Sequence, residues 1–396
     1  MSERMIVIGG GLIGAAIAYG ATRLGLSVRV LDQGDVAYRA SRGNFGLVWV
    51  SSKGEKMPRY ASWSRDALKL WPALQSELFE LTGVDCGLRQ QGGFWLGFSD
   101  AEIKARFELL DGLNKAVGGI PFQFMDPSQL REYLPGLGPA VVGGSFCPLD
   151  GHANPLMLLQ GLHAALKQKG ADMINGVDVA EIRRDPASGL FEILSSDGQR
   201  WVSERVVLAA GLGNERLAGQ VGLHAPVKPV RGQVLITERL KPILRYPMNK
   251  LRQTNEGSVQ IGSSNEDVGF NDRTTTDIIA WQVKRAVNTF PALAHARLVR
   301  AWAALRPMTP DGYPIYQSST SHPGAYIATS HSGVTLAAAH CFVIGAWASG
   351  LLEAPPDFDV FRADRFTDTD ASLQRANRPI VLDPKVSAEA VRHAHV

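Results

Sequence analysis

The sequence predicts an α/β fold in which a Rossmann-like domain with a parallel sheet carries an inserted domain built on an antiparallel sheet. The first observation is an apolar strand, 5–8, that runs into Gly9-Gly10-Gly11-Leu12-Ile13-Gly14 and an Ala-rich helix. This order of strand, G-x-G-x-x-G turn and helix is typical of a dinucleotide-binding unit. The second is a later apolar strand, 205–211, ending in Ala-Gly, which we expect to lie parallel to the first. The third is the strand-rich region 225–305, whose pattern is that of antiparallel strands.

The glycines of the turn each have a physical role. Gly9 allows the tight turn, Gly11 lets the backbone approach a pyrophosphate, and Gly14 lets the helix and the strand pack closely. The helix N-terminus adds N–H groups and a partial positive charge. Asp32 ends a second strand, eighteen residues after Gly14, and is placed to accept hydrogen bonds from an adenosine ribose. We therefore expect a dinucleotide site; the alternative is a glycine-rich turn in another α/β sheet.

The composition is that of a globular enzyme. The chain has 396 residues, 45% hydrophobic and 20% charged, with a net charge of +3, which suggests two or three domains' worth of material. The small net charge and the lack of a basic run predict no nucleic-acid partner. Because the nucleotide-binding strand begins at residue 5, we expect no secretory signal. We expect a cytoplasmic protein without a transmembrane segment, or one bound peripherally to the inner face of the membrane.

The cysteines indicate no cross-linked or metal-bound framework. Cys86, Cys147 and Cys341 are scattered, and none has C-x-x-C spacing. The pattern therefore predicts neither disulfides nor a zinc site, and no other metal is predicted. We expect buried thiols in a reducing compartment.

Apolar residues at helical spacing predict several helices. In the clearest one, Trp63, Leu74 and Leu78 fall on one face. The predicted helices span 60–82, 100–117, 156–169 and 276–290. The apolar run 334–347 is too short to cross a bilayer and predicts a helix buried on all sides.

The strand segments indicate a discontinuous nucleotide-binding domain. Strands are predicted at 173–182, 191–195, 201–209 and 325–329. Two insertions separate these segments from one another and would form a second domain over the cofactor. The nucleotide domain would comprise 1–85, 146–222 and 320–380, the substrate domain 86–145 and 223–319, and the weakly patterned tail 381–396.

Three further segments favour a flavin over a nicotinamide cofactor. Residues 41–46 follow the second strand and offer a hydroxyl, a guanidinium and small residues where a pyrophosphate and a ring can pass. Residues 302–312 place Arg306 at the end of an apolar stretch, before a turn rich in Pro and Gly. Residues 329–336 form a loop that opens the buried helix near the C-terminus. An NAD enzyme is the alternative that these segments disfavour.

Together these segments resemble the FAD-dependent superfamily of D-amino-acid oxidase, glycine oxidase and sarcosine oxidase, over nearly the whole chain. The resemblance implies a glutathione-reductase-like FAD fold with noncovalent FAD and an inserted substrate domain. Within the superfamily the sequence is most similar to the B-type subunits of opine oxidases. That similarity is carried by the loops 49–54, 57–65, 151–156 and 252–257.

The resemblance also implies which residues hold FAD. The turn glycines would bind the pyrophosphate, Asp32 the ribose, and the backbone of Val179 the adenine. The turn and its neighbours would meet the diphosphate and the ribityl chain: Gly9, Gly11, Leu12, Ile13, Gly14, Ser41, Arg42, Ala210 and Gly211. The remaining cofactor contacts would be made by Asn44, Gly46, Leu47, Arg306, Ser332, Gly333, Val334, Thr335 and Leu336, of which 333–336 line the pyrimidine edge of the flavin.

Four side chains are candidates for the catalytic site. The resemblance implies that Arg306 binds the substrate carboxylate, for which the planar guanidinium is well suited; a structural arginine tied to Asp311 is the alternative. His331 would bond the flavin or polarise the substrate, or be a core histidine. Lys53 would place positive charge near the ring, or be a solvated loop lysine. Tyr246 would close the pocket, or pack in an aromatic core.

Two positions depart from the sarcosine oxidases. Ala304 stands where those enzymes carry the cysteine that links FAD covalently, so we expect noncovalent FAD. Gln260 stands at the position matched by a lysine that activates oxygen, which mildly favours a dehydrogenase.

The sequence therefore predicts an FAD-dependent oxidoreductase that oxidises the C–N bond of an amino acid or an opine-like secondary amine. The resulting imine would then hydrolyse. The alternatives are a glycine or D-amino-acid oxidase, and a non-catalytic flavin subunit of a hetero-oligomeric dehydrogenase. The expected partners are a small amino-acid-type substrate and partner subunits.

Overall fold

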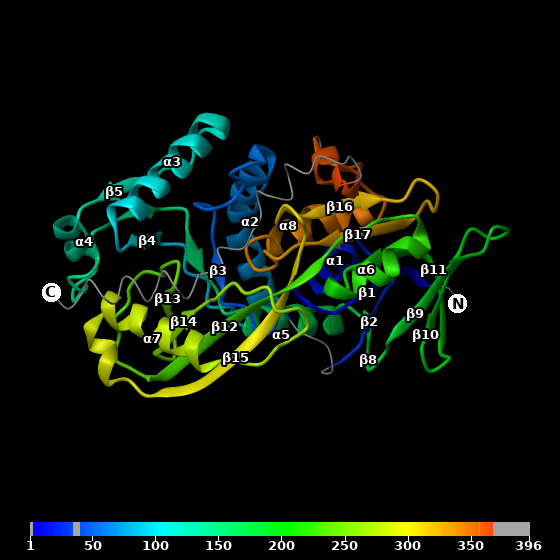
Figure 1. The fold of residues 1–396 in the computed structure, drawn as a ribbon. Helices are drawn as coiled ribbons and strands as arrows, with labels where there is room; N and C mark the ends of the chain where they lie inside the picture. Colours follow the sequence, from blue (N-terminus) through cyan, green and yellow to red (C-terminus); the bar gives the residue numbers. More distant parts are fainter. Residues whose placement is uncertain (1–2, 35–39, 356, 367–396) are drawn as a thin grey trace.

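The computed structural model describes residues 3–34, 40–355 and 357–366. Figure 1 shows two lobes joined by two long strands, β12 and β15. One lobe contains an eight-stranded sheet in which β1 lies between β11 and β2, parallel to both. The strands of this sheet are β1 (Glu3–Ile8), β2 (Val28–Asp32), β8 (Asp172–Asn175), β9 (Val179–Arg184), β10 (Phe191–Ser195), β11 (Arg200–Leu208), β16 (Ile315–Ser318) and β17 (Ala325–Thr329).

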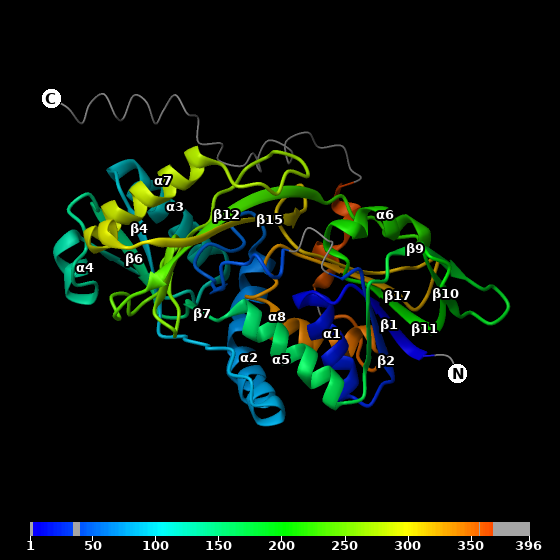
Figure 2. The same cartoon turned by 90° about the horizontal axis from the view of Figure 1, so that it is seen from below.

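Both faces of this sheet are covered, which is why β1 is apolar at successive positions. Met5 and Val7 pack into one core cluster, and Ile6 and Ile8 into another on the opposite face. Helices lie side by side over the first face in Figure 2, and β9, β10 and α6 lie toward the second. The helices over the first face are α1 (Leu12–Arg23), α2 (Pro58–Thr82), α5 (Pro155–Gln168), α8 (Ala337–Ala339) and α9 (Gly345–Ala348), and the short helix toward the second face is α6 (Asn214–Ala218).

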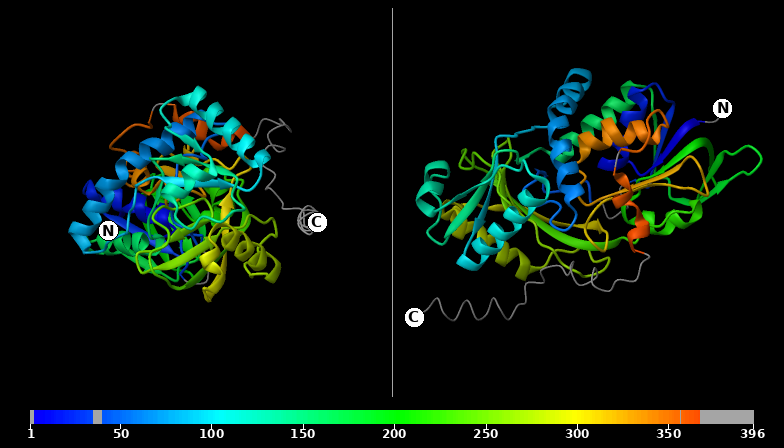
Figure 3. Two further views of the ribbon diagram at one scale, coloured as in Figure 1. Left: turned by 90° about the vertical axis from the view of Figure 1, so that its left-hand side faces the viewer. Right: turned by 90° about the horizontal axis from the view of Figure 1, so that it is seen from above.

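The other lobe is built from two antiparallel sheets that share a hydrophobic core. The first has the order β13-β14-β12-β15 and the second the order β4-β6-β5, and the two views of Figure 3 show α3, α4 and α7 around them. The elements are β4 (Gly93–Gly97), α3 (Asp100–Val117), β5 (Gln123–Met125), α4 (Pro127–Tyr133), β6 (Gly143–Cys147), β12 (Lys228–Arg239), β13 (Leu251–Gln253), β14 (Ser258–Gly262), α7 (Thr276–Thr289) and β15 (Leu298–Met308). A two-stranded ladder, β3 (Leu47–Val48) with β7 (Gly151–His152), lies between the lobes.

The four predicted helices are confirmed within a few residues at each end. The predicted strand 173–182 is wrong as a single element, because the chain turns at Gly176, where φ is +82°, and β8 and β9 pair with different neighbours. The predicted buried helix begins at Ala337 rather than 334 and contains a π-helical turn over 340–344. Residues 333–336 form turns, and the Trp71 indole N–H is directed at carbonyls in this stretch.

The three cysteines are buried and free, as expected. Burial raises the pKa of the Cys86 and Cys147 thiols to about 12. Within the described residues, no helix is both long and apolar enough to cross a bilayer. The bounds of the two-domain division stay a prediction, and the tail, 381–396, lies outside the described residues.

The crossing of α1 with the C-terminal helical segment depends on two glycines. A Cβ added at Gly20 would lie 1.9 Å from the carbonyl oxygen of Cys341, and one at Gly345 would lie 2.9 Å from the Cα of Gly20. The two helices therefore touch backbone to backbone. No other residue type fits at position 20 without moving one helix.

We predict that Gly20→Ala lowers the free energy of unfolding by about 1–3 kcal/mol or more, because the added methyl forces the helices apart. The matched control is Gly112→Ala in α3, an exposed position with no atom near the added Cβ. That variant should gain about 0.5–1 kcal/mol from helix propensity. Chemical unfolding followed by circular dichroism measures both, and equal stability of the two variants would contradict the proposed crossing.

Candidate active site

The glycine turn between β1 and α1 has the close packing that the motif predicts. Gly9 has φ +103°, and a Cβ at Gly14 would lie 1.8 Å from the carbonyl oxygen of Gly9. A Cβ at Gly11 would lie 2.9 Å from the hydroxyl of Ser41, which accepts a hydrogen bond from the backbone N–H of Leu12 at 3.0 Å. The loop after β2 thus lies against the N-terminus of α1. The small residues of the turn leave the backbone N–H groups at the start of α1 accessible to a pyrophosphate.

Asp32 lies at the end of β2 beside this turn. Its carboxylate accepts hydrogen bonds from the backbone N–H of Gly10 at 2.7 Å and of Gly34 at 3.0 Å. The side chain is therefore held in a fixed position at the carboxyl edge of the sheet. That position suits the predicted contact with a ribose.

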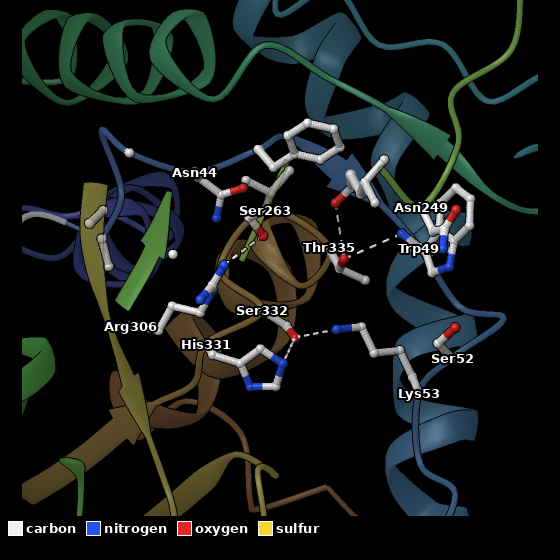
Figure 4. Close-up of a pocket in the computed structure, with 17 residues that line it drawn as sticks. Asn44, Trp49, Ser52, Lys53, Asn249, Ser263, Arg306, His331, Ser332 and Thr335 are labelled. Atoms are coloured by element: carbon white, nitrogen blue, oxygen red, sulfur yellow. Dashed lines mark hydrogen bonds between the residues drawn. The ribbon is translucent and has the colours of Figure 1, made fainter. Parts of the chain in front are cut away.

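A pocket lies between the loop 40–53, the strand β15 and the turn 331–335 (Figure 4). These segments come from distant parts of the chain. The lining residues are Ala40, Gly43, Asn44, Phe45, Leu47, Trp49, Ser52, Lys53, Gly232, Asn249, Ser263, Ala304, Arg306, His331, Ser332, Val334 and Thr335. The lining contains two cationic side chains and no Asp or Glu among the described residues.

The Thr335 hydroxyl ties two of these segments together. It donates to the carbonyl of Leu47 at 3.2 Å and accepts from the backbone N–H of Trp49 at 3.3 Å. Gly333 also lies against α1, since a Cβ there would lie 3.5 Å from that of Leu12. The C-terminal loop, the start of α1 and the loop 40–53 therefore form one continuous surface.

Arg306 extends from β15 into the pocket. Its guanidinium donates to the carbonyls of Arg231 and Ser264 and to the Ser263 hydroxyl, at 3.2, 3.1 and 2.6 Å. These bonds use at most three of its five N–H groups, and no carboxylate of the described residues forms an ion pair with it. Burial lowers the pKa of Arg306 to about 10, which Glu266 partly offsets. A cation held in this way is suited to bind an anion.

Lys53 reaches the pocket from the side opposite Arg306 (Figure 4). Its ammonium donates to the Ser332 hydroxyl at 2.7 Å, which also accepts from the Tyr60 hydroxyl at 2.7 Å. The imidazole of His331 lies 3.3 Å from the same hydroxyl. Burial lowers the pKa of Lys53 to about 8, Asp150 counteracts this shift, and Arg306 adds to it.

His331 is neutral at physiological pH. Burial, and then the charges of Lys53 and Arg306, hold the pKa of its imidazole well below the usual range. The ring lines the pocket between the two cations. A neutral imidazole has one acceptor nitrogen and one donor, so it can orient a polar ligand group without adding charge.

Two buried charged side chains, Asp150 and Arg106, support the loop that carries Lys53. Asp150 accepts hydrogen bonds from the backbone N–H groups of Val50 and Ser51 at 2.7 and 3.2 Å. Arg106 donates to the hydroxyls of Ser51 and Ser52 at 2.9 and 2.8 Å. Burial raises the pKa of Asp150 to about 6 and lowers that of Arg106 to about 10. The charges of these two groups offset each other behind the pocket wall.

Some predicted residues lie elsewhere. Tyr246 packs with Phe94 and Phe146, at ring-centroid distances of 5.4 and 5.9 Å, and does not line the pocket. The carbonyl of Val179 accepts a hydrogen bond from Arg216 at 2.8 Å. Gln260 is buried in β14 and also lies outside the lining.

The other predicted cofactor residues surround the glycine turn and the pocket. Gly211 has φ +60°, and the Ala210 N–H donates to the Asn214 side chain at 2.8 Å. Asn44 accepts from the N–H of Gly46, Arg42 is exposed, and Leu336 is fully buried. Leu12 and Ile13 begin α1.

Sequence reasoning missed Gly232, Ser263 and Asn249. A Cβ at Gly232 would lie 2.1 Å from a terminal guanidinium nitrogen of Arg306, so this glycine in β12 makes room for the side chain. A glycine inside a predicted strand often marks such a close approach, and that signal was available. No sequence pattern marks Ser263 or Asn249 as pocket residues, because their position depends on the tertiary structure.

The residues present fit a dinucleotide whose ring end enters the pocket. The carboxyl edge of the sheet carries the features that such a ligand needs. They are the glycine turn at the start of α1, the held carboxylate of Asp32, and the surface that continues from Ser41 to Thr335. A Cβ at Gly43 would lie 2.3 Å from that of Ala304, so the loop crosses β15 closely at this position. The sheet and the glycine turn are thus those of a dinucleotide-binding α/β protein.

The chain belongs to the DAO family of FAD dependent oxidoreductases, whose model matches residues 4–347. It is 43% identical to the B-type subunit of opine oxidase from Rhizobium meliloti over 365 residues, covering 91% of this chain and 97% of the relative. It is 41% identical to the corresponding opine oxidase subunit from Agrobacterium tumefaciens (strain Ach5), with the same coverage. The crystal structure of glycine oxidase from Geobacillus kaustophilus superposes with a TM-score of 0.84 at 25% identity, covering 91% of this chain and 98% of that one.

These findings confirm the predicted superfamily, the fold class, FAD as the cofactor and an oxidoreductase that acts on C–N bonds. The noncovalent attachment of FAD, inferred from Ala304, stays a prediction. The roles assigned to single residues also stay predictions. The cytoplasmic location does as well.

We predict that Asp32→Ala weakens FAD binding tenfold or more, because a charge-assisted hydrogen bond of about 1.5–3 kcal/mol is lost. The control is Asp172→Ala on the neighbouring strand β8, whose carboxylate pairs with Arg29 near the surface. Titration of the apo-protein with FAD, followed by fluorescence quenching, gives both affinities. Unchanged affinity in Asp32→Ala, with unfolding behaviour like the control, would show that Asp32 is not the ribose ligand.

Proposed function

We propose that this chain oxidises the C–N bond of an N-substituted amino acid, an opine-like secondary amine, and that Arg306 binds the substrate carboxylate. The observation that carries the proposal is the Arg306 guanidinium, which lines a pocket without a carboxylate and keeps N–H groups for a ligand. The two relatives above 40% identity are named as opine oxidase subunits, which supports this substrate class.

The pocket is also suited to keep the substrate amine neutral. Oxidation needs the nitrogen lone pair, so the ammonium form is unreactive. The substrate's own carboxylate favours the ammonium form, and positive charges that pair with it remove this effect; both Arg306 and Lys53 line the pocket. The proton can then be lost to solvent as the amine enters. His331, which is itself neutral, adds no competing charge.

The chemistry itself requires little more than positioning. When bound, FAD supplies the two-electron acceptor for the hydride that leaves the carbon next to the nitrogen. Arg306 fixes the carboxylate, and with it the direction of that C–H bond. The imine left behind adds water and separates into a carbonyl compound and an amine.

We also propose that the chain works with partner subunits. The two opine oxidase relatives are named as subunits, and another relative, 28% identical, is named hydrogen cyanide synthase subunit HcnC. The alternative is that catalysis resides on a partner chain. Assaying the purified chain alone with an artificial electron acceptor separates these two possibilities.

We predict that Arg306→Ala lowers kcat/KM by at least a hundredfold with full flavin content, because an unpaired anion in a desolvated site costs about 3 kcal/mol or more. Arg306→Lys should restore only part of the activity, since a point charge does not replace the planar fork. The control is Arg300→Ala, an exposed position on the same strand. If Arg306→Ala kept near wild-type kcat/KM with flavin bound, the role of Arg306 would be structural and another group would bind the carboxylate.

A further inference from the structure

We infer that Lys53 binds a second carboxylate of the substrate and thereby selects amines that carry two carboxylates over amines that carry one. The inference rests on the proposed function, because it takes Arg306 as the anchor of the first carboxylate. It assigns Lys53 a specificity role toward N-(carboxyalkyl) amino acids, the class in which two carboxylates flank one nitrogen.

The charges around the pocket do not balance. Of the cations near it, Arg231 is paired with Glu266 at 2.5 Å, and Arg285 with Glu102 at 3.4 Å. Lys250 donates to the backbone carbonyl of Ser263 at 2.7 Å. No carboxylate in the described part of the chain forms an ion pair with Lys53 or Arg306. A ligand with two negative charges compensates both of the cations that line the pocket.

Lys53 has donors left for such a ligand. Within the described residues, its ammonium donates to the Ser332 hydroxyl, and an ammonium has three donors. That hydroxyl is neutral and already accepts from Tyr60. The nearby Asp150 is turned toward the backbone of Val50 and Ser51 and does not line the pocket. The ammonium of Lys53 therefore donates to a neutral hydroxyl, and a hydrogen bond to a carboxylate would be stronger.

Lys53 is also held in place on the opposite wall from Arg306. Its backbone N–H donates to the carbonyl of Val50 at 3.0 Å. A Cβ at the next residue, Gly54, would lie 2.4 Å from the backbone nitrogen of Ala61, so the loop lies directly on α2. With Arg306 on β15 and Lys53 on this loop, the two cations face the pocket from different sides (Figure 4). A ligand between them needs an anionic group at each end.

The test uses two thioethers that differ in a single carboxylate. Thiodiacetate carries two carboxylates and (methylthio)acetate one, and neither has a C–N bond to oxidise. Binding to the FAD-loaded protein is followed by the change in the flavin spectrum and by calorimetry. The variants are Lys53→Met, which keeps the length of the side chain, and Lys53→Arg, which keeps its charge. Lys56→Met, an exposed position on the same loop, is the control.

We expect the wild type and Lys56→Met to bind thiodiacetate at least tenfold more tightly than (methylthio)acetate. In Lys53→Met the thiodiacetate affinity should fall tenfold or more, with less than a twofold change for (methylthio)acetate. Lys53→Arg should keep most of the discrimination. Equal losses for both ligands, or no discrimination by the wild type, would overturn the inference.

A role for Lys53 toward the flavin alone gives a different result. In that case Lys53→Met would shift the flavin reduction potential and leave the ratio of the two ligand affinities unchanged, which also overturns the inference. Failure of the proposed function is seen separately. The protein would then discriminate between the thioethers yet fail to oxidise iminodiacetate, the amine of matching shape.

Discussion

The site depends on two cations held in a desolvated pocket whose lining, among the described residues, contains no Asp or Glu. Arg306 and Lys53 approach from different walls, and their hydrogen bonds to side chains and backbone go to neutral groups. By contrast, Arg231, a buried cation near the pocket, is paired with Glu266. The imbalance at the pocket therefore favours an anionic ligand. Burial, and then the charges of these two cations, also hold the pKa of His331 well below its usual range.

The fold creates this pocket by bringing together segments that are far apart in the sequence. The strands β12 and β15 run from one lobe toward the other and carry Gly232 and Arg306 (Figure 1). The loop 40–53 crosses β15 at Ala304 and is held by Thr335 from the C-terminal turn. The loop is further held by the side chains of Asp150 and Arg106, and the C-terminal turn by the indole of Trp71. The geometry of the two cations is thus set before a ligand binds.

Most of the fold was predictable because its signals are local. The glycine turn, the helical spacing in 60–82 and the apolar β11 each depend on neighbouring residues. The break at Gly176 and the late start of the C-terminal helix were missed, because pairing partners and the Trp71 contact decide them. In the site, Arg306 and Lys53 were predicted from the family resemblance and from the chemistry of their side chains. Ser263 and Asn249 carried no signal, and the place of Tyr246 follows from the aromatic cluster it joins.

In the proposed function, this chain presents an amino-acid-type secondary amine for oxidation through its own residues. The most direct measurement is anaerobic mixing of the purified, FAD-loaded chain with iminodiacetate and with longer N-(carboxyalkyl) amino acids, while the flavin absorbance is recorded without any electron acceptor or partner subunit. We expect loss of the oxidised flavin band in proportion to the amine added. A flavin spectrum that shifts on binding but stays oxidised with every such amine would contradict it.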